Sequence, residues 1–303
     1  MQFQIRILGS SSALPTSTRM PTAQVVMYNE TPYLIDCAEG TQMQMRKFSI
    51  PFGKLKNIFI SHLHGDHFYG IFGLLSSFNL LGRKQDLNIY APEELKIIYE
   101  TVLSLNKDHL KYTVNFFPLK GNGKNLIFEN KYLEVYSFPL KHTKPTYGFL
   151  FIEKMKPLNI RKDIIERYEL SITEILKIKA GEDLIDDFGD IIKNSELTTK
   201  PGDIRSYAFC TDTLPLKQLD KYFKNVNLLY HEATFTEDMV ELAKETHHST
   251  AKQAAEIANI TEAKKLLIGH FSSRYHFSDI FIQEAEEIFQ DVIAAEDGML
   301  INL

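Results

Sequence analysis

The chain has few cysteines, and this argues against two classes of protein. Cys37 and Cys210 are the only two cysteines in 303 residues, so they cannot form a disulfide framework. Neither belongs to a Cys-x-x-Cys pair, which argues against dithiol redox chemistry and against zinc held by thiolates. We therefore expect both to be small, buried hydrophobic residues.

Long apolar segments are also missing. No run of about 18 uninterrupted apolar residues occurs, the length that a membrane-spanning helix needs. The first residues, MQFQIRILGSSSALPT, lack the basic, apolar and small-residue regions of a signal peptide. We therefore expect no membrane association and a cytoplasmic location.

Basic residues are not in excess. The 34 lysines and arginines face 39 aspartates and glutamates, which gives a net charge of -5 at pH 7. This balance argues against a protein that coats nucleic acid without specificity. It still permits a local basic patch, and metal cations in a cleft attract phosphate without a positive net charge.

Segments with strand and helix patterns alternate along most of the chain. We expect strands at 2–8, 22–28, 31–37, 57–61, 87–92, 133–142, 147–153, 206–212, 226–234 and 264–271. We expect helices at 41–48, 69–81, 93–105, 215–223, 250–260 and 278–291. A chain with 44% hydrophobic residues can bury a large core, so two sheets flanked by helices are the expected α/β architecture.

The segment from about 154 to 200 interrupts this alternation. It is charged, contains helical fragments at 162–180, and separates two strands that each lead to a metal-binding type of residue. We expect a single domain over 1–303 with this arm inserted in it, either as a plain insertion or as a place for substrate contacts. The first half of the arm is basic and contains Lys154, Lys156, Arg161, Lys162, Arg167, Lys177 and Lys179.

The segment SHLHGDH, residues 61–67, concentrates residues that bind metals. His62, His64, Asp66 and His67 supply nitrogen and oxygen ligands from a single loop after a strand. Four adjacent ligands exceed what one tetrahedral zinc needs from one loop, which indicates two metals. A polar loop that is His-rich by chance is a weak alternative, because imidazoles this close together need partners when they are buried.

Further ligands follow other strands. His142, Asp212 and His270 each come at or just after the end of an expected strand. Taken alone, each of these residues is more often a cap or a core residue than a ligand. Together, in this order, they are the remote ligands that a dinuclear site requires.

The chain resembles the metallo-β-lactamase fold and, within it, the ribonuclease Z family of tRNA 3′ processing endonucleases. SHLHGDH is typical of the whole superfamily, whereas later segments narrow the resemblance to ribonuclease Z. The matching segments run through nearly the whole chain: LGSSSALPTSTR, LIDCAEGTQMQM, SHLHGDH, LKHTKPTYGF, CTDT, HEATF, HHSTAKQAAEIA and LLIGHFSSRY. The resemblance implies an αββα sandwich of two mixed sheets flanked by helices.

The resemblance also implies a role for each candidate site residue. One zinc ion is held by His62, His64 and His142, the other by Asp66, His67 and His270, and Asp212 bridges them. Two Zn²⁺ per chain are expected, and Mn²⁺ or another divalent ion is the alternative. Asp66 also accepts the proton of the attacking water, and His248 protonates the leaving oxygen.

Two further expectations concern the surroundings of the proton donor. We infer that Glu232 orients His248, as carboxylates orient catalytic histidines. We expect the neighbouring His247 to be a surface residue. Thr211 replaces the glycine that the family has before its bridging aspartate.

The resemblance implies a zinc-dependent endoribonuclease that cleaves the 3′ trailer from precursor tRNA. The cut leaves a 3′-hydroxyl on the tRNA and a 5′-phosphate on the trailer, and the family's homodimer is expected. The alternative is a phosphodiesterase of the same fold that acts on a small phosphodiester. The arm at about 154–200 favours RNA, because a small substrate needs no such contact. A catalytically silent RNA-binding module is disfavoured, because every ligand position is occupied by a suitable residue.

Overall fold

The computed structural model describes residues 2–105, 110–186 and 188–303. Most of these residues form one compact body, which we call unit 1: Met1–Phe128, Val135–Phe151 and Arg205–Leu303. The rest form a second body, unit 2: Glu129–Glu134 and Ile152–Ile204.

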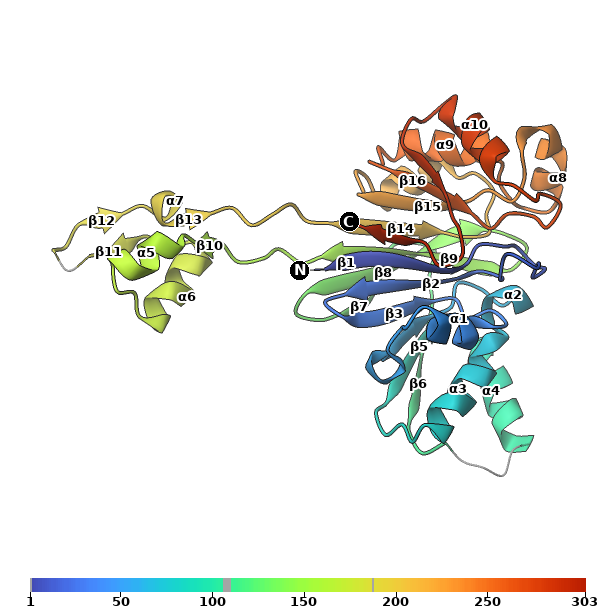
Figure 1. The fold of residues 1–303 in the computed structure, drawn as a ribbon, viewed down its shortest axis with the longest axis horizontal. Helices are drawn as coiled ribbons and strands as arrows, with labels where there is room; N and C mark the ends of the chain where they lie inside the picture. Colours follow the sequence, from blue (N-terminus) through green and yellow to red (C-terminus); the bar gives the residue numbers. More distant parts are fainter. Residues whose placement is uncertain (1, 106–109, 187) are drawn as a thin grey trace. The chain divides into compact units, whose positions relative to one another are not determined.

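The first sheet of unit 1 has seven strands in the order β18-β1-β2-β3-β4-β5-β6 (Figure 1). Strands β1, β2, β3 and β18 pair antiparallel, whereas β3, β4, β5 and β6 pair parallel, so the sheet is mixed. The strands are β18 (Leu300–Asn302), β1 (Phe3–Gly9), β2 (Ala23–Tyr28), β3 (Thr31–Ile35), β4 (Asn57–Phe59), β5 (Leu87–Ala91) and β6 (Val114–Pro118).

The second sheet also has seven strands, in the order β17-β16-β15-β14-β9-β8-β7. Strands β14 to β17 are parallel neighbours. All residues of β15 and β16 are buried, as expected for parallel strands covered on both faces. The strands are β17 (Val292–Ala294), β16 (Leu266–Gly269), β15 (Leu228–Glu232), β14 (Ser206–Cys210), β9 (Pro145–Glu153), β8 (Leu133–Lys141) and β7 (Asn125–Glu129).

Helices cover the outer faces of the two sheets (Figure 1). Helices α1 (Thr41–Lys47), α3 (Gly70–Leu80) and α4 (Glu94–Leu105) share a buried apolar core with the first sheet. Helix α9 (Ala251–Ile260) packs on β15 and β16, and α10 (Asp279–Glu286) packs on α9 and β17. The expected sandwich of two mixed sheets flanked by helices is therefore confirmed.

The structure corrects two expected helices and adds four strands to the two seven-stranded sheets. Residues 215–223 form only a short 3₁₀ helix, Lys217–Lys221, and the last helix ends at Glu286 rather than near residue 291. Strands β6, β7, β17 and β18 were not predicted. Both cysteines are fully buried, as expected.

Unit 2 has a small apolar core of its own, made of Ile164, Leu170, Ile178, Leu184 and Leu197. Its helix α6 (Ile172–Ala180) begins with a capping box between Ser171 and Glu174, which satisfies free N–H groups of the first turn. The other elements are β10 (Asn159–Ile160), α5 (Lys162–Arg167), β11 (Leu184–Ile185), β12 (Ile191–Ile192), α7 (Asn194–Leu197) and β13 (Thr198–Thr199).

Candidate metal centre

The predicted ligands lie in loops that follow the carboxyl ends of several strands of unit 1. Because neighbouring parallel strands end at the same edge of a sheet, side chains that follow them converge there. His62 and His64 follow β4, and the short helix α2 (Gly65–Phe68) carries Asp66 and His67. His142, Asp212 and His270 follow β8, β14 and β16.

Three histidines form the first group. Nε2 of His62 lies 3.0 Å from Nδ1 of His64, and Nε2 of His142 lies 3.2 Å from the same atom. Oδ2 of Asp212 lies 3.5 Å from Nε2 of His62 and 3.7 Å from Nε2 of His142. One ligand atom of each of these four residues therefore faces a common point.

Asp66, His67 and His270 form the second group. Oδ2 of Asp66 lies 3.4 Å from Nε2 of His67 and 3.7 Å from Nε2 of His270. The other oxygen of Asp212, Oδ1, lies 3.3 Å from Nε2 of His67 and 3.2 Å from Nε2 of His270. Asp212 thus directs one oxygen to each group, which is the position of a bridging ligand.

The chemistry of these donors suits divalent cations. Burial lowers the pKa of His62, His64 and His142, so these rings are neutral and keep the lone pair that a metal ligand needs. Burial opposes the charge of Asp212, but neighbouring His270 and His67 outweigh it and lower the pKa of that carboxyl. Within the described residues, Nε2 of His67 and Nε2 of His270 are buried without a hydrogen-bond partner, as nitrogens that bind metal would be.

The second ring nitrogen of each of these histidines has a partner that the sequence did not reveal. Nδ1 of His67 lies 2.8 Å from Oδ2 of Asp36, and Nδ1 of His142 lies 2.9 Å from the backbone oxygen of His247. Such partners fix the tautomer and the orientation of a metal-binding histidine. Others are Ser61 for His62, Thr143 for His64 and Thr234 for His270.

Two residues near the centre, His247 and Thr211, differ from what the sequence indicates. The prediction that His247 is a surface residue is wrong, because it is half-buried and its carbonyl faces His142. Thr211 is buried and its hydroxyl donates to Oδ1 of Asp212 at 3.0 Å. The residue that replaces the family's glycine therefore contacts the carboxylate of Asp212.

Three residues around the centre have backbone conformations in the left-handed region. The φ angles are 55° for Asp36, 59° for His247 and 64° for His270. Such conformations cost free energy in residues other than glycine and cluster at functional sites. The position of these groups is thus imposed by the surrounding fold.

His248 and Glu232 form a pair at the edge of the second group. Nδ1 of His248 lies 2.9 Å from Oε1 of Glu232, which is fully buried at the end of β15. Burial disfavours the charge of His248, but the carboxylate of Glu232 outweighs this effect and raises the pKa of His248 to about 9. The predicted partner of His248 is therefore in hydrogen-bonding contact with it.

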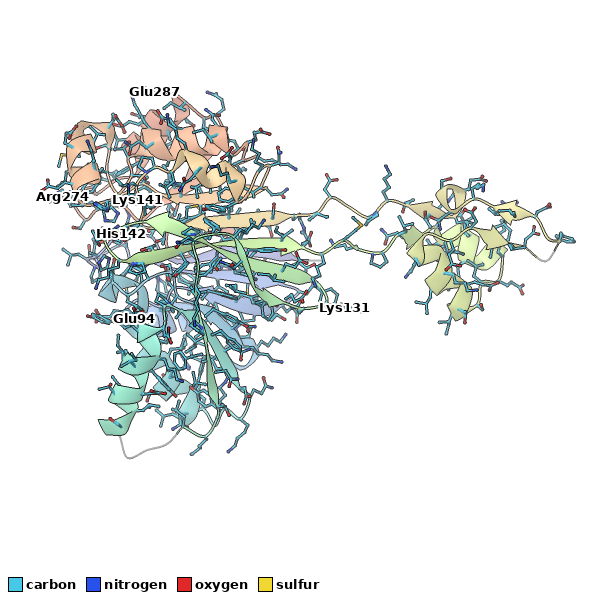
Figure 2. The ribbon with its side chains drawn as sticks, turned by 180° about the vertical axis from the view of Figure 1, so that it is seen from behind. Glu94, Lys131, Lys141, His142, Arg274 and Glu287 are labelled. Carbon is cyan, nitrogen blue, oxygen red and sulfur yellow. The ribbon has the colours of Figure 1, made fainter. Side chains whose placement is uncertain are left out.

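A cavity of about 590 Å³ gives access to these groups. Its lining includes Asp66, Asp212, His248 and His270, together with residues of the loop 12–14. Arg274 also lines the cavity, from the same side of unit 1 as His142, and both are labelled in Figure 2. Arg274 is exposed and lies over the ring of Phe235 at 6.0 Å, so a cation is present at the opening.

The sequence and the fold match known proteins. The family model described as Anti-Pycsar protein Apyc1 matches residues 3–175, more than half of the chain. A ribonuclease Z from Bacteroides thetaiotaomicron is 42% identical over 302 residues, which are 100% of this chain and 96% of the relative.

Two solved structures share the fold. The crystal structure of human tRNase Z, short form, has 28% sequence identity and a TM-score of 0.71, over 98% of each chain. The metallo-β-lactamase fold protein YhfI from Bacillus subtilis has a TM-score of 0.72 over 100% of each chain, at 14% identity. The chain therefore belongs to the ribonuclease Z family, has the metallo-β-lactamase fold, and over residues 3–175 belongs to the family that the Apyc1 model describes.

Proposed function

We propose that this chain is an endoribonuclease that hydrolyses one phosphodiester bond of precursor tRNA and so removes the 3′ trailer. The observation that carries this proposal is the position of Asp212, whose two oxygens face two separate groups of ligands. A hydrolase that uses two metals to cut phosphodiesters needs such a shared ligand. The names of the full-length relatives support RNA as the substrate class.

The first ion would be held by His62, His64 and His142, the second by Asp66, His67 and His270, with Asp212 shared between them. Zn²⁺, or Mn²⁺ in its place, supplies Lewis-acid stabilisation of charge on the phosphodiester and lowers the pKa of water. The histidine and carboxylate donors suit either metal.

Two side chains of the cavity would move the protons. Asp66 is partly exposed to the cavity, and its carboxylate accepts the proton of the water that attacks phosphorus. His248, held through Nδ1 by Glu232, donates the proton of Nε2 to the leaving 3′ oxygen as the bond to phosphorus breaks. The products are a 3′-hydroxyl on the tRNA and a 5′-phosphate on the trailer.

Contacts to the rest of the RNA would come from cations outside the metal centre. Arg274 at the opening can bind a phosphate through two N–H groups. In unit 2, Lys154, Lys156 and Arg161 form ion pairs with Glu129, Glu153 and Asp163. Among the described residues of the basic part of unit 2, no ion pair involves Lys162, Arg167, Lys177 or Lys179, so these four are the candidates for phosphate contacts.

Two further features belong to the proposal. We place the protein in the cytoplasm, as its sequence predicts. The structure itself has no helix long and apolar enough to cross a membrane in the ranges that it describes. We also propose a homodimer, which size-exclusion chromatography with light scattering tests.

The test is incubation with a 3′-extended precursor tRNA and mapping of both new ends. We expect a single cut after the discriminator nucleotide, loss of activity on chelation, and recovery on addition of Zn²⁺ or Mn²⁺. A protein that hydrolyses a small phosphodiester but leaves the precursor intact would support the alternative, a small-molecule phosphodiesterase.

A further inference from the structure

Asp36 is a buried carboxylate that contacts His67 of the second group directly and reaches the first group through a hydroxyl. Oδ1 of Asp36 accepts the N–H of Ser61 at 2.8 Å, and Oδ2 accepts the Ser61 hydroxyl at 2.9 Å. The same hydroxyl oxygen lies 3.0 Å from Nδ1 of His62. Asp36, Ser61 and His62 therefore form a continuous chain of contacts, and all three are fully buried.

Glu232 has the same arrangement next to the second group. Oε2 of Glu232 accepts the N–H of Thr234 at 2.9 Å and the Thr234 hydroxyl at 2.8 Å. The hydroxyl oxygen of Thr234 lies 2.9 Å from Nδ1 of His270. Carboxylate, hydroxyl and predicted ligand follow one another in the same order as around Asp36.

The number of hydrogens fixes the direction of these bonds. A hydroxyl has one hydrogen to donate, and an ionised carboxylate can only accept. Backbone N–H groups of Thr213 and Ser249 also point at Glu232, at 3.1 Å each, which favours its ionised form. The Thr234 hydrogen therefore goes to Glu232, and the oxygen of Thr234 must accept from Nδ1–H of His270.

A histidine that carries its hydrogen on Nδ1 has a free lone pair on Nε2. Nε2 of His62 faces the first group, and Nε2 of His270 faces the second, where it lies 3.2 Å from Oδ1 of Asp212. We propose that the pairs Asp36–Ser61 and Glu232–Thr234 act as two carboxylate–hydroxyl relays. The Asp36–Ser61 relay holds His62, and the Glu232–Thr234 relay holds His270, in the tautomer that binds metal. Each ion therefore has one relay. This inference rests on the metal centre proposed above.

The relays differ from the other contacts of the centre in one respect. His67 and His142 use a carboxylate and a backbone carbonyl, which can only accept, so their tautomers need no further partner. A hydroxyl can donate or accept, and it becomes a reliable acceptor only when a carboxylate takes its hydrogen. Ser61 and Thr234 are thus positioning residues whose effect depends on Asp36 and Glu232.

The test compares hydroxyl deletion with hydroxyl retention at one position. Affinity for Zn²⁺ is measured by chelator competition for the wild type, Thr234→Val, Thr234→Ser and Thr261→Val. Thr261 is a matched control, because its hydroxyl is also buried and donates only to backbone carbonyls of α9, at Ile257 and Ala258. We expect Thr234→Val to lower the affinity for one of the two ions by about 10- to 100-fold. This is the usual loss when a residue that hydrogen-bonds to a metal-binding histidine is removed. The Zn²⁺ affinities of Thr234→Ser and Thr261→Val should remain close to that of the wild type. Ser61→Ala should lower the affinity for the other ion.

Two results would overturn the relays. Equal loss in Thr234→Val and Thr234→Ser would assign the effect to disturbed packing around residue 234 rather than to the hydroxyl, and full affinity in Thr234→Val would show that the hydroxyl is not needed. If a variant fails to fold, ¹H–¹⁵N spectra of zinc-loaded wild-type protein with labelled histidine decide instead. We expect Nδ1–H at His62 and His270, and Nε2–H at either contradicts the proposal. Failure of the proposed function is seen separately, as wild-type protein that binds no metal or leaves precursor tRNA uncut.

Discussion

At the scale of single residues, Asp66 is expected to act both as a metal ligand and as a proton acceptor. Replacing it by Ala should abolish cleavage and leave binding of precursor tRNA largely intact, because the carboxylate acts on water and metal rather than on the body of the RNA. We expect a loss of about 3 kcal/mol or more in activation free energy. Single-turnover cleavage and a filter-binding assay measure the two effects.

The matched control for this substitution is Asp279→Ala, which removes an exposed carboxylate of α10 that does not line the cavity. It should cleave like the wild type. If Asp66→Ala also kept near wild-type cleavage, the assignment of Asp66 would be wrong.

Replacing His248 should slow the cleavage step and leave the metal content unchanged. Its Nδ1 is bound to Glu232, and we assign its Nε2 to the leaving oxygen rather than to an ion. His248→Ala should slow cleavage of precursor tRNA by about 10²- to 10⁴-fold, the usual contribution of a general acid. The variant should recover on a nitrophenyl phosphodiester, whose leaving group needs no proton.

The competing interpretation is that His248 binds a metal ion, in a third group of ligands with Asp212 and His270. One ring nitrogen of His248 lies within 4.8 Å of a carboxylate oxygen of Asp212 and of a ring nitrogen of His270. Loss of an ion from His248→Ala would support that interpretation. Equal damage on both substrates with full metal content would indicate a structural role.

At the scale of elements, the close contact between α3 and the loop after β3 supports Asp36. Gly70, the first residue of α3, donates to the carbonyl of Cys37, and a Cβ at Gly70 would lie 1.9 Å from the backbone oxygen of Ala38. Gly70→Ala must therefore displace the loop that carries Asp36. We expect a loss of about 1–3 kcal/mol in unfolding free energy, typical of overpacking, together with weaker metal binding.

Gly73 is the control in the same helix. A Cβ there meets only the side chain of Gln42, at 3.4 Å. Gly73→Ala should retain metal and gain stability by up to about 1 kcal/mol, because Ala is the better helix former. Denaturant unfolding of the two variants decides this, and equal stability of Gly70→Ala and the wild type would contradict the steric account.

The strands that sequence patterns predicted are the inner ones. Ten strands lie inside the two sheets and were all expected, whereas β6, β7, β17 and β18 lie at the four sheet edges and were not. An edge strand buries less of its surface and so needs a weaker apolar pattern. In β7, for example, no residue is fully buried.

The seven ligand residues could be predicted because four of them are concentrated in SHLHGDH and the other three follow later strands in a combination that a dinuclear site requires, and the structure brings all seven together. Asp36, Ser61 and Thr234 could not, because acids and hydroxyl residues at strand ends usually cap backbone groups. Their proximity to histidines far away in the sequence comes only from the fold.

At the scale of the whole molecule, removing most of unit 2 should distinguish precursor tRNA from a small phosphodiester as the substrate. Unit 2 has its own core, and none of the seven predicted ligands lies within it. Replacing residues 154–200 by a short linker should raise the apparent KM for precursor tRNA strongly and flatten its dependence on salt, because phosphate contacts are lost. Hydrolysis of a small chromogenic phosphodiester should stay roughly unchanged.

Removing positive charges from unit 2, without deleting it, tests which of its residues contact phosphate. Changing Lys162, Arg167, Lys177 and Lys179 to Gln should reproduce part of the salt effect, whereas changing the ion-paired Lys154, Lys156 and Arg161 should have less effect. If a folded, fully metallated deletion processed tRNA like the wild type, unit 2 would not bind the RNA, and the small-molecule alternative would gain support.

The central claim is that Asp212 joins two groups of ligands into one dinuclear centre. Metal analysis of the intact chain, purified without chelator and then saturated with Zn²⁺, tests it most directly. We expect two ions per chain in the wild type and a loss of bound metal in Asp212→Ala, since each oxygen of Asp212 faces one group. One ion or none in the saturated wild-type protein would contradict the account.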